Sequence, residues 1–177
     1  MEHRQRLAPS PTRSMMLVDL VRFQVAWWSL VLLGQSGLVI GVILLLIQFR
    51  LSQRRVADGI VMAAIAMPGV LMDAMASYFG LFEFAGLPVW LALLWCHFGL
   101  SCQYSLRPVL GLNAWWVLVI GALGGSASYW AGVQLGAVSS SLSGPELVMY
   151  LMPLWAGVFI YAKTIIETQA MMPAETH

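Results

Sequence analysis

Charge is scarce in this sequence. Charged residues make up 10% of the chain and apolar residues 60%, whereas an ordinary soluble domain carries roughly 25% charged residues. The nine Lys and Arg residues nearly balance the eight Asp and Glu residues, so the overall charge gives no reason to expect a nucleic-acid partner. The shortage of charge excludes an ordinary soluble domain and indicates an integral membrane protein.

Cysteine is scarce as well. Cys96 and Cys102 are the only two, and both lie in an apolar run, which argues against a disulfide framework. His97 stands beside Cys96, but on a helix with about 100° per residue the three side chains point in different directions. We therefore expect no metal site and no cofactor.

Long stretches without charge place the membrane spans. Residues 23–49 carry no charge over 27 positions, and a bilayer core needs about 20 apolar residues per span. This stretch is either one long span or two short spans folded at residues 34–37. Further apolar runs follow at residues 59–82, 88–107, 112–136 and 143–163.

The basic residues favour the two-span alternative. If residues 23–49 form a hairpin, all nine Lys and Arg residues lie on one side of the membrane, and the opposite loops carry Glu83 and Glu146. A single span would place the basic N-terminal tail and the basic loop at residues 50–55 on opposite sides. Cytoplasmic loops are enriched in Lys and Arg, so the hairpin fits better.

The predicted fold class is therefore all-α, a polytopic transmembrane helix bundle of six short spans with both termini in the cytoplasm. A basic polar tail is expected at residues 1–17, the six-helix domain at residues 18–163, and a C-terminal tail at residues 164–177. The expected location is the inner membrane of a bacterium.

Asp73 is the first candidate for a functional group, because a carboxylate inside a span costs several kcal/mol unless it is paired, neutral or wetted. His97 lies in the next span, and the two side chains differ in depth by roughly 6 Å at about 1.5 Å rise per residue. Either Asp73 is a protonated carboxyl that joins two helices and His97 packs in the core, or both groups act in function. The candidate polar site comprises Asp73, His97, Gln103, Ser126, Ser128 and Tyr129.

The fifth apolar run carries small residues at about four-residue spacing. Such spacing lets a neighbouring helix approach closely, and we favour this packing role. The alternative is a path or pocket lined by Ser126, Ser128 and Tyr129. The proposed helix-packing stripe consists of Gly121, Gly125, Gly132 and Gly136.

Two prolines fall inside apolar runs. Pro68 and Pro153 each remove a helix hydrogen bond and free the carbonyl four residues earlier, at Ala64 and Met149. The small residues and prolines also fit, more weakly, an inverted repeat of three helices, which would suit a transporter.

Three short patterns lie along the apolar runs. They are Gly69-x-x-x-Asp73, then Leu94-Trp95-x-x-Phe98 with Ser105-Leu106, and Gly124-Gly125-x-x-Ser128-Tyr129-x-Ala131-Gly132-x-x-Leu135-Gly136-Ala137. Together they resemble a bacterial integral-membrane family of unknown function, made of short multi-pass inner-membrane proteins found mostly in proteobacteria. The resemblance covers residues 25–161, and Ser126 stands where the family pattern has a proline. It implies a bacterial membrane protein but no activity.

Three functions follow as hypotheses. The first is a non-enzymatic membrane protein, either an accessory subunit or one that acts on lipids or the envelope, with membrane lipids, a second copy or another membrane protein as partner. The second is a small proton-coupled transporter that uses Asp73 and His97. The third, an intramembrane enzyme, has the least support, because no Ser–His, paired-carboxylate or metal motif occurs at suitable spacing.

Overall fold

A computed structural model describes residues 11–84 and 86–171, and these residues form helices joined by turns, with no strand among them. The predicted all-α class is confirmed. The elements are α1 (Arg13–Leu33), the 3-10 helix η1 (Gly34–Gly37), α2 (Leu38–Leu51), α3 (Arg55–Tyr78), α4 (Val89–Ser101), α5 (Arg107–Leu110), α6 (Ala114–Gln134) and α7 (Gly144–Met171).

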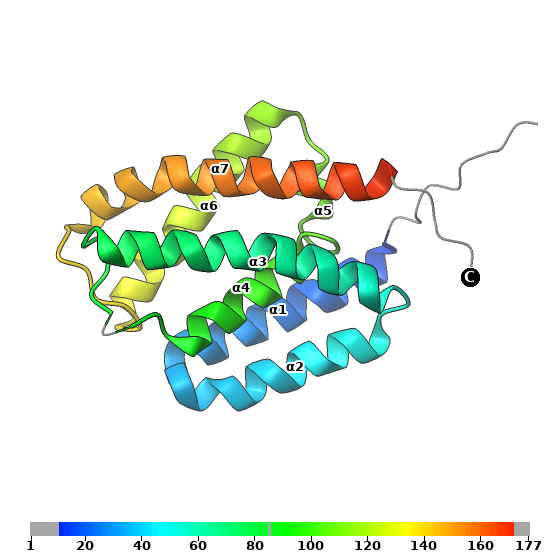
Figure 1. Cartoon of the computed structure of the whole chain (residues 1–177), viewed down its shortest axis with the longest axis horizontal. Coiled ribbons are helices and arrows are strands. Elements are labelled where there is room, and N and C mark those ends of the chain that lie inside the picture. Colours follow the sequence, from blue (N-terminus) through cyan, green and yellow to red (C-terminus); the bar gives the residue numbers. More distant parts are fainter. Residues whose placement is uncertain (1–10, 85, 172–177) are drawn as a thin grey trace, which may run out of the picture.

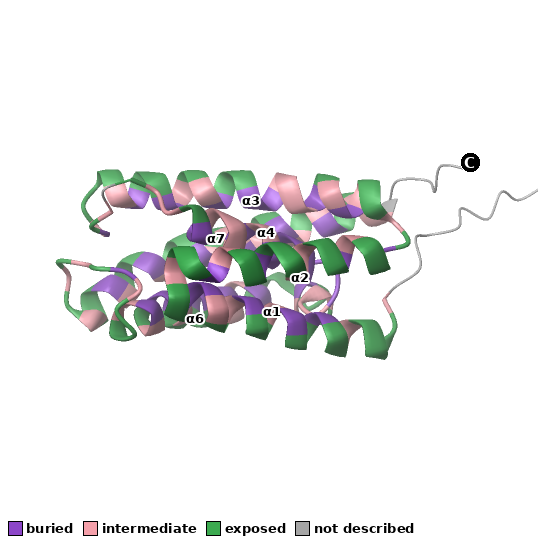
Figure 2. Cartoon of the chain, turned by 90° about the horizontal axis from the view of Figure 1, so that it is seen from below, coloured by how far each residue is buried: buried purple, intermediate pink, exposed green. Residues whose placement is uncertain are grey.

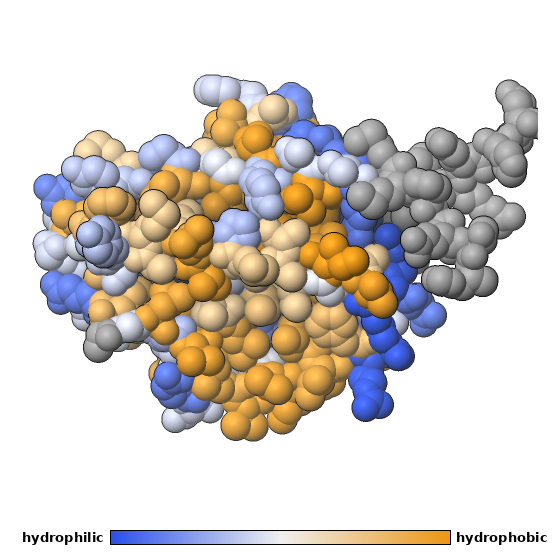
Figure 3. Space-filling model, in the orientation of Figure 1, coloured by the Kyte–Doolittle hydropathy of each residue, from blue (hydrophilic) through white to orange (hydrophobic). Residues whose placement is uncertain are grey.

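Four helical segments are long and apolar enough to cross a membrane: Arg13–Leu51, Arg55–Tyr78, Ala114–Gln134 and Gly144–Ala170. Apolar atoms gather over the middle of the face shown in Figure 3, and hydrophilic atoms lie mainly toward its two ends. Buried residues follow the inward faces of the helices, and exposed ones the outward faces (Figure 2). Such a surface suits an apolar solvent around the middle of the bundle.

The first of these segments is bent back on itself. α1 ends at Gly34, whose φ of 53° is unfavourable for residues with a side chain. A Cβ atom on Gly37 would lie 2.3 Å from the carbonyl oxygen of Ser29, so only glycine permits the close return. The chain reverses here, at the residues expected for a hairpin, and α2 runs back beside α1 (Figure 1).

The ends of the bundle differ in charge. One end of the bundle, on the right in Figure 1, is formed by the start of α1, the α2–α3 connection, α5 and the end of α7. The other end is formed by the α3–α4 and α6–α7 connections. The first group of segments contains Arg13, the basic run at residues 50–55, Arg107 and Lys163. Glu83 lies in the α3–α4 connection, and Glu146 lies in the first turn of α7, directly after the α6–α7 connection.

Both predicted tails differ partly from the structure. α1 begins at Arg13 and α7 continues to Met171, so helix reaches into the stretches expected as polar tails at residues 1–17 and 164–177. Lys163 does not end the helix, because it forms a salt bridge with Glu167 one turn later, with Nζ 2.7 Å from Oε1. Residues 1–10 and 172–177 lie outside the described residues.

Local sequence signals explain several other features. Ser143 donates from its backbone N and its Oγ to Glu146 Oε2, at 2.9 and 2.7 Å, and α7 starts there as expected. The carbonyl of Ala64, freed by Pro68, accepts a hydrogen bond of 3.1 Å from the Tyr161 hydroxyl. This bond joins α3 to α7 and satisfies the carbonyl that the proline leaves without a helix partner.

Two of the four glycines of the predicted stripe, Gly121 and Gly125, lie against α7. A Cβ on Gly121 would lie 2.6 Å from Phe159 Cβ, and one on Gly125 would lie 2.0 Å from Trp155 Cδ2, so both allow α6 to pack closely on α7. Gly132 has only Val138 at 4.0 Å. Gly136 has no such neighbour and a φ of 74°, and it ends the helix, because Gly136 N and Ala137 N donate to the carbonyls of Val133 and Gly132.

Candidate functional site

The Asp73 carboxyl lies at the meeting point of α3, α4 and α6. Its side chain is fully buried. Trp95 Nε1 donates to Oδ2 at 2.6 Å, and the Tyr129 hydroxyl lies 2.6 Å from Oδ1 and 2.7 Å from Oδ2. The expectation that Asp73 faces the bundle agrees with this burial.

Gly69 makes the Trp95 contact possible. It precedes Asp73 by one helical turn, and a Cβ at this position would lie 2.2 Å from Trp95 Cε3. The indole therefore lies flat on the α3 backbone, with its N–H directed at Asp73. The Gly69-x-x-x-Asp73 spacing provides both the space and the acceptor for one tryptophan.

No basic side chain pairs with Asp73 among the described residues. Their salt bridges join Arg22 to Asp19 and Lys163 to Glu167. The carboxyl is held by two neutral donors alone, although removing a charged group from water is costly without a counter-charge.

Trp95 and Tyr129 also line a cleft of about 240 Å³. The cleft is formed by α1, α4, α6 and α7, together with Leu106, and seven of its fourteen lining residues are aromatic. Most of the others are aliphatic or glycine. The aromatic residues are Phe23, Trp27, Trp95, Phe98, Tyr129, Trp155 and Phe159.

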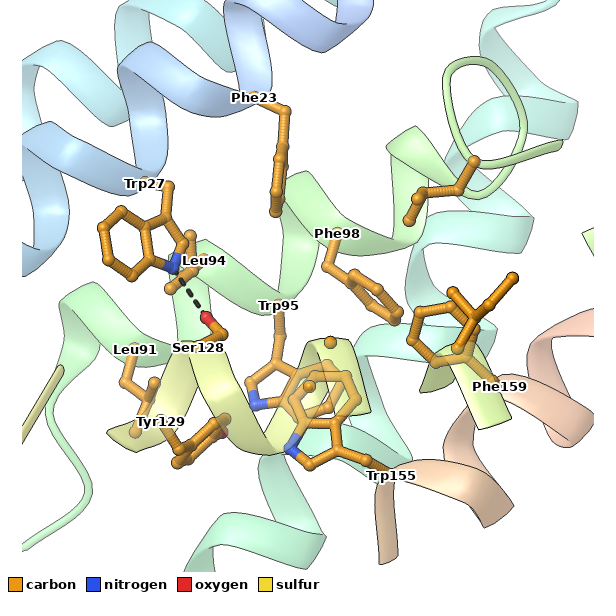
Figure 4. Close-up of a pocket in the computed structure, with 14 residues that line it drawn as sticks. Phe23, Trp27, Leu91, Leu94, Trp95, Phe98, Ser128, Tyr129, Trp155 and Phe159 are labelled. Carbon is orange, nitrogen blue, oxygen red and sulfur yellow. Dashed lines mark hydrogen bonds between the residues drawn. The ribbon is translucent and has the colours of Figure 1, made fainter. Parts of the chain in front are cut away.

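Five of these rings, those of Trp95, Phe98, Tyr129, Trp155 and Phe159, contact one another (Figure 4). Trp95 and Trp155 are stacked, with centroids 5.2 Å apart and planes 9° apart. Phe98 meets both edge to face at 5.5 Å, and the ring of Tyr129 lies 5.6 Å from that of Trp155. The indole N–H of Trp155 is buried and has no hydrogen-bond partner.

Two further polar groups of the cleft are bonded to each other, which leaves the Trp155 N–H as the unpaired donor of the lining. Trp27 Nε1 in α1 donates to Ser128 Oγ in α6 at 2.9 Å (Figure 4). This bond connects two helices that pack little against one another. The cleft therefore offers few free polar atoms.

His97 belongs to a different network. Its Nδ1 is bonded to Arg22 Nη1, and its Nε2 lies 3.1 Å from the carbonyl oxygen of Gly41. Arginine can only donate, so Nδ1 accepts, Nε2 carries the proton and the imidazole is neutral. Arg22 also pairs with Asp19 at 2.6 Å, and Asp19 accepts from the backbone N and the Oγ of Ser105.

Gln103 lies in a third network, around Asp58. Its side-chain amide donates to the Asp58 carbonyl at 3.5 Å. The Asp58 carboxylate accepts from Ser52 Oγ at 2.6 Å and from the Tyr104 hydroxyl at 2.5 Å. Burial, followed by the hydrogen bond to Asp58, raises the pKa of Tyr104 to about 12.

The structure thus divides the predicted polar site. Asp73 and Tyr129 meet directly, and Ser128 lies on the same cleft. The expected contact between Asp73 and His97 is not formed, since each has other partners, and Ser126 bonds only the carbonyl of Ala122 in its own helix. Sequence reasoning missed Trp95 and Trp155. Trp95 stands in the pattern Leu94-Trp95-x-x-Phe98, which could have indicated it, whereas nothing in the sequence distinguishes Trp155 from the other tryptophans.

Comparisons with known proteins give a family but no function. No curated protein and no solved structure matches the chain. One family model, described as "Protein of unknown function (DUF2878)", matches residues 16–161, a stretch that includes every residue of the Asp73 network and the aromatic cleft. The chain belongs to this family of unknown function.

Proposed function

We propose that this protein is a non-enzymatic integral membrane protein that binds the apolar part of a lipid-like molecule in the aromatic cleft. The observation that carries the proposal is a cleft of about 240 Å³ with an almost wholly apolar lining. For comparison, an engineered apolar cavity of about 150 Å³ binds benzene. The cleft is large enough for a ring or for several methylene groups of a chain.

The position of the cleft supports access from the lipid. Gly124 lines it and is exposed, and it lies near the middle of α6. The opening is therefore at mid-height on the side of the bundle, where a bilayer places acyl chains. A ligand could enter sideways from the membrane without passing through water.

The chemistry of the lining supports an apolar ligand. The Tyr129 hydroxyl is bonded to Asp73 and the Ser128 hydroxyl accepts from Trp27. Apart from the unpaired N–H of Trp155, few groups of the lining would replace the hydration of a polar substrate, and each group left unpaired costs roughly 1–3 kcal/mol. An alkyl chain or an apolar ring has no hydrogen bonds to water that it would lose in the cleft.

We infer a location in the bacterial inner membrane with both termini in the cytoplasm and six crossings, by α1, α2, α3, α4, α6 and α7. The basic residues at one end of the bundle support this orientation. α2 and α4 have 14 and 13 residues, about 20 Å each at 1.5 Å per residue. Their shortness would require local thinning of the bilayer, whose core is about 30 Å thick.

A transporter in which Asp73 and His97 exchange protons receives less support. Asp73 is bonded to Trp95 and Tyr129, and His97 is fixed between Arg22 and Gly41. His97 and Gln103 do not line the cleft. A coupled pair would need a shared cavity or a direct contact.

Lipid retention tests the proposal. The wild-type protein, purified in a mild detergent and analysed by native mass spectrometry, should carry a bound hydrophobic molecule. Gly124→Leu should remove it, because Gly124 lines the cleft at its exposed side and a larger side chain there narrows the opening, while a Cβ at this position has no atom within 4 Å to displace. Gly157→Leu on the exposed face of α7, where a Cβ also has open space, is the matched control. Equal retention by the two variants would contradict the proposal.

A further inference from the structure

We propose that the ligand of the aromatic cleft carries a positive charge without N–H groups, as a quaternary ammonium does, and that Asp73 supplies the balancing negative charge. This inference rests on the proposed function, because it names the ligand class for the same cleft. Four observations carry it: an unbalanced buried carboxyl, its bonds to two cleft rings, the aromatic wall, and the shortage of acceptors.

Among the described residues Asp73 is one of two buried carboxyls, with Asp58, that no basic side chain pairs, and it is the one bonded to residues of the cleft. Arg22, the buried guanidinium, already pairs with Asp19 and bonds His97. Asp73 is fully buried and receives hydrogen bonds only from neutral groups. A cation placed nearby would repay part of the cost of burying this charge, which no described residue does.

Trp95 and Tyr129 connect the carboxyl to the cleft. Each donates its polar hydrogen to Asp73 at 2.6 Å, and each lines the cavity. The negative charge therefore lies one ring away from the cavity. The faces of Trp95 are covered by Gly69 and Trp155, but donation to a carboxylate also shifts electron density into the Tyr129 ring, which strengthens the attraction of that ring for a cation.

The aromatic wall provides the remaining contacts. Trp155 stacks on Trp95, and Trp27, Phe23 and Phe159 line other parts of the cleft. A cation over the face of an aromatic ring is attracted by the ring quadrupole, most strongly when water is excluded, and aromatic cages recognise quaternary ammonium ligands in this way. A neutral alkyl group would gain only the apolar contact.

The shortage of acceptors selects the type of cation. A primary ammonium must satisfy three N–H donors, but the side-chain oxygens of the lining are only two hydroxyls, of Ser128 and Tyr129, and each already takes part in a hydrogen bond. A quaternary ammonium has no N–H group and requires none of these oxygens. Its apolar substituents also suit the entry from the lipid.

A pair of ligands of the same shape tests the charge. Binding of labelled decyltrimethylammonium to the full-length protein in nanodiscs is compared with that of 2,2-dimethyldodecane, in which carbon replaces the charged nitrogen. Gly124→Leu, which narrows the opening of the cleft, gives the background from partition into lipid. We expect the wild-type protein to bind the cation at least about tenfold more tightly than the neutral analogue.

Variants then locate the charge effect. Asp73→Asn should reduce the preference to less than about twofold, and Tyr129→Phe, which keeps the ring but removes its bond to Asp73, should weaken cation binding more than neutral binding. Gly157→Leu should behave as wild type. If Asp73→Asn does not fold, the wild-type preference decides alone.

The outcomes separate the two proposals. Equal binding of cation and neutral analogue to the cleft would overturn the charge inference and leave lipid binding intact. Undiminished cation preference in Asp73→Asn would also overturn it. Binding of neither ligand above the Gly124→Leu background would overturn the proposed function as well.

Discussion

At the scale of single residues, Asp73 depends on its two donors. A buried carboxyl in an apolar bundle is tolerated when its lone pairs are occupied, and Trp95 and Tyr129 provide three close contacts. The two donors also need this acceptor, because Trp95 and Tyr129 are buried and their polar hydrogens would otherwise have no hydrogen-bond partner. The three side chains therefore stabilise the bundle as a unit.

This mutual dependence gives the first prediction. Asp73→Leu leaves the N–H of Trp95 and the hydroxyl of Tyr129 unpaired, each at a cost of about 1–3 kcal/mol, whereas Asp73→Asn keeps an acceptor oxygen. The free energy of unfolding in detergent should fall by about 2–5 kcal/mol for the leucine variant and by less than about 1.5 kcal/mol for the asparagine variant. Equal losses would show that the hydrogen bonds do not join the helices.

The second prediction concerns two glycines of α6. A Cβ at Gly125 would overlap Trp155 at 2.0 Å, whereas one at Gly132 has its nearest contact at 4.0 Å. Gly125→Ala should cost about 1–3 kcal/mol through overpacking, and Gly132→Ala should be neutral or stabilising, because alanine favours helix by about 1 kcal/mol. Thermal unfolding of both variants checks this, and similar melting temperatures would contradict the packing of α6 on α7.

At the scale of elements, α4 is the central connector. It is short and ends at Ser101, and the turn that follows is fixed by Ser105 on Asp19 of α1 and Tyr104 on Asp58 of α3. His97 adds bonds to Arg22 and to the carbonyl of Gly41. α4 thereby holds the α1–α2 hairpin and α3 together at the basic end of the bundle.

Loss of the hydrogen bond from Tyr104 to Asp58 should weaken this anchor at alkaline pH, because the phenol then loses its proton. Its pKa is raised from 10.0 to about 12, first by burial and then by the hydrogen bond to Asp58. The folded state thus favours the neutral phenol, so the stabilisation is complete below pH 10 and is lost as the pH rises toward about 12.

Comparison of wild type with Tyr104→Phe isolates this effect. The wild-type protein should be the more stable below pH 10, and the difference in melting temperature should shrink between pH 10 and 12. Phenylalanine removes only the hydroxyl and so serves as its own packing control. A difference that stays constant over this range would contradict the role of the neutral phenol.

The sequence allowed the elements to be predicted better than the contacts. Gly34 and the distribution of Lys and Arg indicated the hairpin, and Pro68 indicated the free carbonyl at Ala64. The partner of Asp73 was harder to predict, since Tyr129 lies 56 residues away in another helix. Helices such as α4 are apolar on all sides, so their pattern does not distinguish the face toward the bundle from the face toward lipid.

At the scale of the whole molecule, the charge difference between the two ends predicts the orientation. Reporter fusions after Arg55, after Arg107 and at the C-terminal end should report the cytoplasm, and fusions near Glu83 and Ser141 the opposite side. The reason is that the segments with Lys and Arg gather at one end of the bundle. A reporter at the N-terminus that faced away from the cytoplasm would contradict the hairpin as two crossings.

The proposed function depends on whether an apolar chain occupies the aromatic cleft. Photo-crosslinking answers this most directly, with a lipid that carries a diazirine on its acyl chain and the labelled residues identified by mass spectrometry. Labelling should include Phe98 and Phe159, which are 7% and 6% exposed and line the cleft, so that lipid around the bundle does not reach them. Gly124→Leu should abolish these labels and leave those on the outer surface unchanged. Labels confined to outward residues such as Leu46 and Met67, which are 58% and 71% exposed, would contradict the account.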